Sequence, residues 1–383
     1  QYDKQGRIII PDNLKIFAGI DKEISIIGMI TKIELWSPDK IKKYDDQINI
    51  DEFDDLADDI SFWNMNDRIQ HPHVPVLLEE VVSKIITEKS GIYVDCTIGF
   101  GGHSFGILNS INNDGKLFGI DYDPYALKYS KERLSKLQKP FELLLSNYID
   151  VKGILKEKNI KEVNGILFDL GISSYQVDSG YKGISYRIDS DLDMRMDPNS
   201  KKNIKKLIKE SSNEELADMI YFNSEEKNSR KIAKSIKCRD IKDLMKTNSD
   251  LVSAIEEVTP KRFLNKTLSR VFQAFRIELN NEFRNIYKAT VDAISLLSPG
   301  GRLGVITFHS LEDRLVKNIF RSYARGDGSY LNKMGYEVSE VLGKKIKILT
   351  KKPIMPNRNE ILNNKRARSA KLRIVERVLV AWI

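Results

Sequence analysis

The chain has 383 residues, which is enough for two or three domains that each bury a core. Its two cysteines and four histidines exclude a disulfide framework, and no Cys/His zinc site or other metal centre is expected. The formal net charge is +8, and no run of eighteen apolar residues predicts a transmembrane helix.

The charge is distributed unevenly. Residues 1–64 hold 8 Lys and Arg against 14 Asp and Glu, and subtraction from the totals of 62 and 54 leaves 54 basic and 40 acidic residues elsewhere. A basic body suits a polyanion such as RNA, although biased base content in a genome also produces lysine-rich chains. The low cysteine content predicts a reducing, cytoplasmic setting without membrane association. Gln1 in place of an initiator Met predicts a fragment or a processed chain.

The first 64 residues predict a small β-rich module. Short strands are expected at 7–10, 24–30 and 33–36, followed by a helix at 38–44 and an acidic stretch at 51–59. The segments Asp3–Pro11, Ala18–Glu23 and Ile33–Trp36 resemble the second swapped-hairpin module of the MraZ transcriptional regulators, which are related to AbrB-type DNA-binding domains. The module is truncated and net acidic, so DNA binding by this module alone is not expected.

A glycine-rich turn predicts half of a nucleotide-binding βαβ unit. The apolar strand at 93–95 runs into the turn at 99–104, a helix follows, and a second strand ends in Asp121. Glycines let backbone N–H groups approach a ligand closely. Asp121 lies twenty residues after Gly101, where a carboxylate can accept both hydroxyls of an adenosine ribose. The pattern favours a nucleoside cofactor over a strand–turn–helix with incidental glycines.

The remaining elements predict an α/β sheet interrupted by helices. Strands are expected at 141–145 and 165–169, the latter almost entirely apolar, as in a central parallel strand. Residues 178–270 are polar and helical, with a capping box at Ser212–Glu215. The other expected elements are a helix at 79–88, a long helix at 272–297, a turn at 298–301, a buried strand at 302–308 and a basic tail from Lys344.

Polar residues follow several of these strands. Because a ligand lies across the carboxyl ends of the strands in an open α/β sheet, Asp121, Asp169 and His309 are expected to converge there. Tyr148, just after the third strand, could cover an adenine ring. Methyl transfer from a sulfonium to the exocyclic amine of a base needs an acceptor for the amine N–H, because the nitrogen lone pair is delocalised. Asp169, which opens a Gly- and Ser-containing turn, suits that task without a metal.

Five ordered motifs resemble the bacterial small-subunit ribosomal RNA cytosine-N4 methyltransferase family, the MraW type. They are Gly-Phe-Gly-Gly-His-Ser at 99–104, Asp-Leu-Gly-Ile-Ser-Ser at 169–174, Leu-Asp-Met-Arg-Met-Asp at 192–197, Phe-Gln-Ala-Phe-Arg-Ile at 272–277 and Phe-His-Ser-Leu-Glu-Asp-Arg at 308–314. The resemblance covers about 71–378. It implies a Rossmann-like fold with an inserted helical subdomain, S-adenosylmethionine as methyl donor, and a cytidine in the decoding region of 16S ribosomal RNA as target. The substrate would be free RNA or the assembling 30S subunit.

The resemblance also implies roles for single residues. The cofactor-binding positions are Gly101, Gly102, His103, Asp121, Tyr148, Asp169 and Gln176, and the catalytic candidates are Asp169, Ser173 and His309. Three departures from the family pattern are Tyr148 for Phe, Tyr175 for Pro, and the run Lys182–Arg187 for Arg-Gly-Phe-Ser-Phe-Arg.

Two structural interpretations compete with these roles. His309 could only order the turn between strand and helix through Ser310 and Asp313. Asp193, Arg195 and Asp197 could form an internal ion-pair network rather than contact RNA. The helical insert and the basic tail, with Lys365, Arg366, Arg368, Lys371 and Arg373, are expected to supply RNA contacts.

Four regions are therefore expected. They are a truncated MraZ-like module with an acidic linker at 1–64, the first part of the methyltransferase domain at 65–177, a helical insert at 178–270, and the second part with the basic tail at 271–383. Met65 stands where a separate protein could begin, so the chain resembles a fusion or read-through product. A nicotinamide oxidoreductase, a DNA-binding regulator with a metabolite-sensing body, and an enzyme acting on DNA or protein amines stay open, as does a homodimer.

Overall fold

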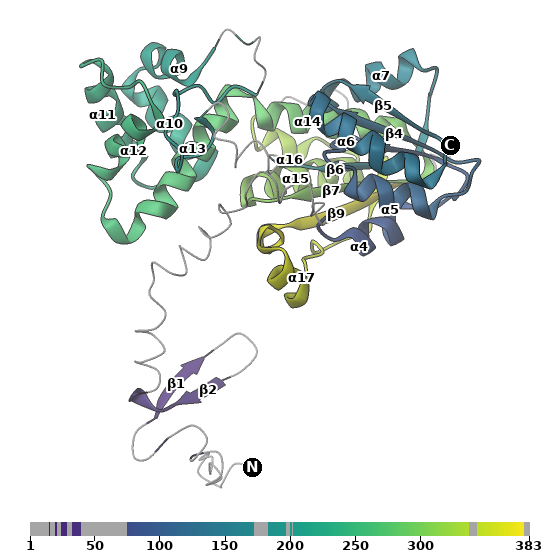
Figure 1. Cartoon of the computed structure of the whole chain (residues 1–383), viewed down its shortest axis with the longest axis horizontal. Coiled ribbons are helices and arrows are strands. Elements are labelled where there is room, and N and C mark those ends of the chain that lie inside the picture. Colours follow the sequence, from purple (N-terminus) through teal and green to yellow (C-terminus); the bar gives the residue numbers. More distant parts are fainter. Residues whose placement is uncertain are drawn as a thin grey trace. The chain divides into compact units, whose positions relative to one another are not determined.

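The computed structural model describes residues 15, 20, 24–28, 33–39, 75–171, 183–196, 200, 202–336 and 343–378. Contacts divide the chain into two compact units, Gln1–Met65 and Asn66–Ile383 (Figure 1). In the described residues, none of the helices combines the length and the apolar composition needed to cross a bilayer.

The first unit contains an antiparallel hairpin. Strand β1 (Ser25–Gly28) pairs with β2 (Ile33–Trp36), which confirms two of the strands predicted for this region. The strand predicted at 7–10 lies outside the described residues. Of the helix predicted at 38–44, only the first two residues are described, and both are helical.

In the described part of the second unit, seven strands form one sheet in the order β5-β4-β3-β6-β7-β9-β8. The strands are β3 (Ile92–Asp95), β4 (Lys116–Asp121), β5 (Phe141–Leu145), β6 (Val163–Asp169), β7 (Leu297–Thr307), β8 (Ile346–Ile348) and β9 (Lys371–Arg377). Strands β5, β4, β3, β6 and β7 run parallel, whereas β9 is antiparallel to β7 and β8 is antiparallel to β9. The chain moves outward from β3 to β5 and then returns to β6. The strand order therefore reverses between β3 and β6, and the predicted α/β fold is confirmed.

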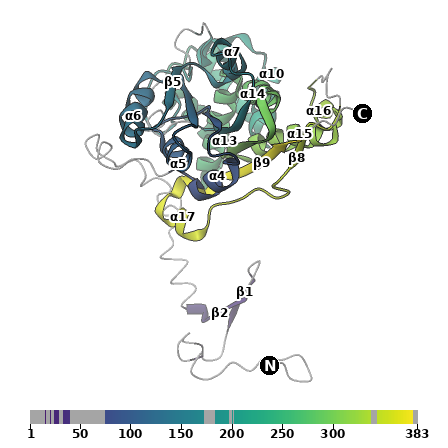
Figure 2. The same ribbon diagram turned by 90° about the vertical axis from the view of Figure 1, so that its right-hand side faces the viewer.

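Alternating residues of the parallel strands build a core on each face of the sheet. One face carries Tyr93, Leu117, Leu167 and Ile306, and the other carries Val94, Phe118, Phe168 and Val305. Helices α4 (Leu78–Ile85), α5 (Gly102–Ser110) and α6 (Pro124–Leu134) cover the first face, and α7 (Val151–Glu157), α14 (Glu282–Leu296) and α15 (Ser310–Arg325) cover the second. Figure 2 shows α4 and α5 on one side of the sheet and α7 and α14 on the other.

Five helices between β6 and α14 form a separate core (Figure 1). They are α9 (Ile204–Glu210), α10 (Asn213–Ser224), α11 (Ser229–Asp240), α12 (Asn248–Glu256) and α13 (Leu264–Leu279). Their buried residues include Leu216, Ile232, Leu251, Leu268 and Phe272. The predicted capping box starts α10: the Ser212 hydroxyl accepts the N–H of Glu215 at 3.1 Å, and the Glu215 carboxylate accepts the N–H of Ser212 at 2.8 Å.

The prediction of a single long helix at 272–297 is wrong. The chain forms α13 and α14 instead, with a break at Asn280 and Asn281. Asn281 adopts a left-handed conformation with φ 51°, which Asn tolerates better than most residues. The Asn280 amide donates to the carbonyls of Arg276 at 2.9 Å and Met194 at 3.0 Å, so its side chain, at the end of α13, satisfies two backbone acceptors. The helical spacing of apolar residues continues across the break because both helices face a core.

The end of the chain also departs from the prediction. Strand β7 begins at Leu297, so residues 298–301 belong to a strand whose pairing with β6 shifts register near Gly165. The stretch predicted as a basic tail holds β8, β9, and the short helix α17 (Arg358–Asn363). Arg373 of β9 is buried and donates to Asp313 at 2.6 and 3.0 Å. The prediction of an RNA contact is therefore wrong for Arg373, because its charge is used inside the fold.

Candidate functional site

The carboxyl ends of four parallel strands place polar side chains at one edge of the sheet. Asp95 ends β3, Asp121 ends β4 and Asp169 ends β6, while His309 follows β7. The strands lie in the order β4-β3-β6-β7, so these residues come together although they span more than half of the sequence. This arrangement agrees with the convergence predicted from the strand ends.

The glycine turn joins β3 to α5 in a conformation that favours glycine. Gly99 and Gly101 have φ values of +49° and +72°. A Cβ on Gly101 would lie 3.1 Å from the Ser130 hydroxyl, and one on Gly102 would lie 3.0 Å from Pro75. Packing within the protein therefore contributes to the glycine requirement that the sequence attributed to a ligand. Gly101 caps α5 without a side-chain hydrogen bond, and no side chain of the described residues is seen to occupy the N–H groups of the first turn of α5.

Asp121 fastens the end of β4 to the glycine turn. Its Oδ2 accepts the N–H of Gly99 at 2.9 Å, and its Oδ1 accepts the N–H of Asp123 at 3.0 Å. Burial raises the pKa of Asp121 to about 6. Each carboxylate oxygen keeps a further lone pair, so the group can still accept ligand hydroxyls.

Tyr148 begins a short 3₁₀ segment after β5. Its ring meets Phe168 edge to face, with the centroids 5.8 Å apart, and it packs against the core on the α7 and α14 face. Burial raises the pKa of its hydroxyl. The side chain is thus partly used in packing, and adenine stacking stays a prediction.

Asp169 meets the imidazole of His103 at the point where the strand order reverses. Its Oδ2 lies 3.6 Å from His103 Nδ1, and its backbone N–H donates to the Thr97 hydroxyl at 2.6 Å. Within the described residues, Oδ1 of Asp169 is buried without a hydrogen-bond partner. Burial raises the pKa of Asp169 to about 6, and the nearby Asp95 adds to the effect. An unsatisfied buried acceptor is the feature that an incoming N–H donor would complete.

Asp95 lies behind this pair. The Ser104 hydroxyl donates to its Oδ2 at 2.7 Å, and the Thr97 N–H donates to its Oδ1 at 3.2 Å. The residue is fully buried, and desolvation raises its pKa. Asp95 therefore holds the turn together and has no exposed surface to offer a ligand.

His309 has a structural task. It caps α15: its Nδ1 accepts the N–H of Glu312 at 3.3 Å, and the Glu312 carboxylate accepts the N–H of Phe308 at 2.9 Å. The other ring nitrogen lies 2.9 Å from Glu312 Oε1. This geometry supports the turn-ordering role. The backbone N–H of Asp313 donates to the His309 carbonyl at 3.2 Å, while the Asp313 side chain pairs with Arg373.

A second buried ionic group was missed by the sequence analysis. Arg276 of α13 pairs with Glu282 of α14 at 2.8 Å, and burial raises the pKa of Glu282. The pKa of Glu312 stays low because His309 stands beside its carboxylate. The sequence signal for this ionic group was the presence of charged residues among the apolar residues of the helices.

Other predicted residues are accounted for as follows. Ser173 and Gln176 lie outside the described residues, as does Asp197. Arg195 makes a two-pronged contact with Asp193, at 2.5 and 2.7 Å, so the internal ion pair is confirmed for these two residues. Among the described residues, no cluster of His, Cys, Asp or Glu side chains could hold a metal ion.

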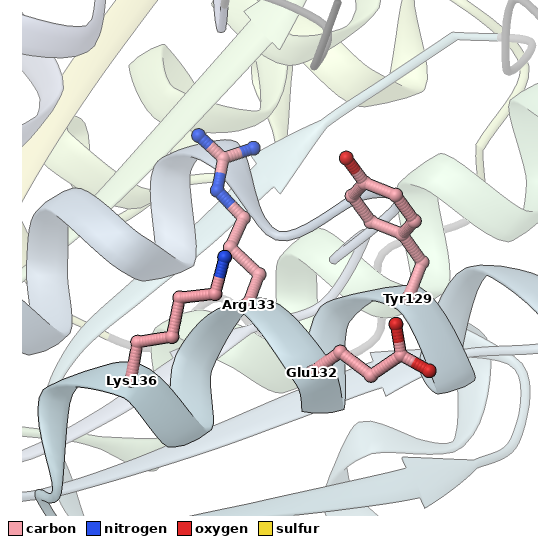
Figure 3. Close-up of a pocket in the computed structure, with 4 residues that line it drawn as sticks. All are labelled: Tyr129, Glu132, Arg133 and Lys136. Atoms are coloured by element: carbon pink, nitrogen blue, oxygen red, sulfur yellow. The ribbon is translucent and has the colours of Figure 1, made fainter. Parts of the chain in front are cut away.

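A shallow pocket lies on α6, beside the glycine turn (Figure 3). Tyr129, Glu132, Arg133 and Lys136 line it. The Tyr129 ring meets Phe100 edge to face at 5.2 Å, and Arg133 donates to the Phe100 carbonyl at 3.3 Å. These contacts brace the turn from outside, and none of the strand-end carboxylates lines this pocket.

Comparisons with known proteins cover both units. The model of the MraW methylase family matches residues 70–378, and that of the MraZ protein family, described as antitoxin-like, matches residues 1–62. The ribosomal RNA small subunit methyltransferase H of Mesoplasma florum is 41% identical over 310 residues, which cover 80% of this chain and 99% of that protein. The Brevibacillus brevis protein of the same name is also 41% identical over 310 residues, covering 80% and 98%. A solved rRNA methylase from Streptococcus thermophilus aligns with a TM-score of 0.35 and 11% identity, covering 78% of this chain and 93% of that one.

Proposed function

Since the chain belongs to the MraW methylase family, we propose that it methylates N4 of a cytidine in the decoding region of small-subunit ribosomal RNA, with S-adenosylmethionine as methyl donor. The names of the similar proteins support ribosomal RNA as the substrate class. The residues of the site fit a nucleoside cofactor, and one of them can accept the N–H of the target amine.

The residues at the ends of β3 and β4 fit the nucleoside part of the donor. Asp121 has lone pairs left for ribose hydroxyls, and the first turn of α5 has N–H groups that no side chain in the described part of the chain occupies. Tyr148 lies just after β5, in position to border the adenine. When bound, the donor supplies an electrophilic methyl group on a sulfonium.

The position and surroundings of the Asp169 carboxylate are the main support for the proposed methyl transfer. The amine of cytosine is a weak nucleophile, so an acceptor must take one N–H while the nitrogen lone pair turns toward the methyl group. Asp169 offers a carboxylate at the switch point of the sheet, one oxygen of which has no hydrogen-bond partner among the described residues, and Thr97 holds its backbone. The side chain would orient the amine and accept its proton. Ser173 and Gln176 of the following turn are proposed as further contacts.

We propose that the helices α9 to α13, which form the separate core, provide the surface that binds RNA. Large apolar side chains that are exposed there include Tyr221, Phe222, Ile241, Leu244 and Phe263. Arg262 lies over the Phe263 ring at 4.6 Å, and Tyr221 meets Phe222 edge to face. Aromatic faces next to cationic groups favour stacked, unpaired bases.

The division of labour follows from these assignments. We propose residues 65–177 and 271–383 as the catalytic domain, 178–270 as the substrate-recognition insert, and 1–64 as an MraZ-like module that does not bind DNA alone. The proposed setting is cytoplasmic, and a homodimer is one arrangement that sedimentation would test.

Nucleoside mass spectrometry of ribosomal RNA tests the proposal. Cells that contain the protein should yield N4-methylcytidine in 16S RNA, and cells without it should not. Cells that carry the Asp169→Ala variant, at equal protein abundance, should resemble cells without the protein. Unchanged N4-methylcytidine in cells that lack the protein would contradict the target, and near-normal turnover of Asp169→Ala would contradict the role of Asp169.

The alternatives have direct tests as well. A nicotinamide oxidoreductase would bind NAD, whereas a methylase should bind S-adenosylhomocysteine and give no heat with NAD in calorimetric titration. A DNA-binding regulator would retain promoter fragments at moderate salt after removal of residues 65–383. Methyl transfer to DNA or to protein amines would appear as radiolabel in those polymers.

A further inference from the structure

His103 is buried in the site with both of its ring nitrogens facing acceptors. Its Nε2 lies 2.8 Å from the Val76 carbonyl oxygen, and its Nδ1 lies 3.6 Å from Asp169 Oδ2. The side chain is 6% exposed, so water does not replace either contact. The resemblance placed His103 in the turn that holds the cofactor, but its side chain points at Asp169 and into the protein.

These contacts determine where the proton on the ring sits. A carbonyl oxygen can only accept, so Nε2 carries the hydrogen and donates it to Val76. The neutral ring then presents the lone pair of Nδ1 to the carboxylate of Asp169. Two acceptors face one another at 3.6 Å, a distance at which no hydrogen bond joins them. One added proton would turn this contact into a charge-assisted hydrogen bond.

We propose that His103 is a positioning residue that receives, through Asp169, the proton that the amine loses during methyl transfer. The inference rests on the proposed function. The bond between the amine nitrogen and the methyl carbon forms, and the methyl–sulfur bond breaks with its electron pair staying on sulfur. The amine N–H proton passes to Asp169 and then to Nδ1 of His103. The sulfonium charge is thereby replaced by an imidazolium charge, and Asp169 ends as a carboxylate.

The surroundings favour this charge arrangement. Among the described residues, Asp95 of β3 and Glu312 of α15 act electrostatically on Asp169, and both are acidic. A positive imidazolium among these carboxylates is stabilised by their charge. The hydrogen bond between Asp169 and His103 exists only once the proton has been transferred. The contact therefore stabilises the later stage of the reaction more than its beginning.

Two substitutions separate the ring's tasks. His103→Gln keeps an amide group that can donate to Val76 but lacks a base at Nδ1, whereas His103→Asn places an amide near Asp169 that cannot take a proton. Both full-length variants are assayed at saturating S-adenosylmethionine, because His103 belongs to the turn that is expected to hold the cofactor. Their kcat should fall roughly 100-fold with KM for RNA unchanged, the loss expected when proton acceptance is removed. Equal kcat for wild type and His103→Gln would overturn the proposal.

Nitrogen NMR of ¹⁵N-histidine-labelled protein gives a readout that does not need turnover. With four histidines in the chain, the His103 signals are identified by their loss in His103→Gln. They should show a hydrogen on Nε2 and none on Nδ1, the tautomer that the Val76 carbonyl and the Asp169 carboxylate impose on the neutral ring. An Nδ1–H tautomer in the folded wild-type protein would overturn the proposal.

The two proposals fail differently. If the protein makes no N4-methylcytidine but the ring carries its hydrogen on Nε2 as described, the target assignment fails and the arrangement of His103 beside Asp169 stands. If wild type and His103→Gln both methylate RNA at the same rate, the target stands and the role of His103 fails.

Discussion

Two carboxylates at the strand ends differ in how their charge is supported. Asp121 accepts a backbone N–H at each oxygen, whereas Asp169 has His103 on one side and an oxygen without a partner. Burial raises the pKa of both to about 6. Asp121 is suited to remain a charged acceptor, and Asp169 is suited to gain a proton and lose it again.

Asp121→Ala should weaken cofactor binding and leave turnover at saturating cofactor largely intact. Hydrogen bonds to a charged group are worth about 1.5–3 kcal/mol, so the Kd for S-adenosylhomocysteine should rise roughly 10- to 150-fold. Calorimetric titration measures the change. Asp114→Ala, which removes an exposed carboxylate in the turn before β4, is the matched control and should bind normally. A Kd within twofold of the wild type for Asp121→Ala would contradict the ribose role.

Asp169→Asn should stabilise the fold at alkaline pH while it abolishes methylation. The folded-state pKa of about 6 lies above the ordinary value of 3.8. The stability that Asp169 contributes is therefore fully present below about pH 4 and is lost as the pH rises through 6. Asn does not titrate, and its amide can donate to Nδ1 of His103. Urea unfolding should show the variant gaining on the order of 1–3 kcal/mol relative to wild type between pH 4 and pH 8. If the stability gained by the variant over wild type shrank as the pH rose, the result would contradict a raised pKa for Asp169.

Single residues show where sequence analysis stops. Asp121 and Asp169 were predicted because each ends an apolar strand, a signal that is local in sequence. The meeting of His103 with Asp169 was not predicted, because it joins residues 66 positions apart: α5 follows β3, and β3 lies beside β6 in the sheet. Ser173 and Gln176 stay predictions. Glu312 was overlooked because His is an uncommon helix cap, although Glu three residues later is the usual companion of a cap.

At the scale of elements, the break between α13 and α14 shows how apolar spacing misleads. The spacing reports which residues face a core, and it continued through two helices in turn. Two consecutive Asn residues were the local signal of a stop. The strand β9 was missed for a related reason: its apolar residues lie between Lys371, Arg373 and Glu376, and the charges were interpreted as part of a basic tail that contacts RNA.

The left-handed residue at the break can be tested with a matched pair of substitutions. Asn281 has φ 51° and no side-chain capping bond, so its backbone conformation dominates the outcome. Asn281→Ala should lower the free energy of unfolding by about 1–2 kcal/mol, whereas Asn281→Gly should change it by less than about 0.5 kcal/mol. Urea denaturation followed by circular dichroism compares them. Equal loss in both variants would show that the conformation is not what limits this position.

At the scale of the whole molecule, the parallel part of the sheet could be predicted from the sequence. Apolar strands alternating with helices indicated a parallel sheet, and right-handed crossovers leave few arrangements of such strands. The antiparallel pair β8 and β9 could not be placed in the same way. Its position depends on the ion pair between Arg373 and Asp313, whose members lie 60 residues apart.

The basic residues near the carboxyl end should be tested one at a time. Deletion of residues 357–383 would remove β9 from between β7 and β8, so any loss of RNA binding would reflect unfolding. Arg368 is exposed, and Arg368→Ala should weaken binding to a 16S RNA fragment and reduce the slope of log K against log salt by roughly one. Lys158→Ala, at an exposed residue that pairs with Glu142, is the control with an unchanged slope. An unaltered slope for Arg368→Ala would remove this residue from the RNA surface.

The place of β9 has a consequence for the nascent chain. On the ribosome, the helices from α9 to α13 can bury their own core soon after Leu279 emerges, but one edge of β7 has no partner until residues 371–377 have been translated. Until then, β7 exposes a row of unpaired backbone groups that other strands can join. Chains that stop before residue 371 should therefore aggregate, and β9 protects the domain from association with its own copies.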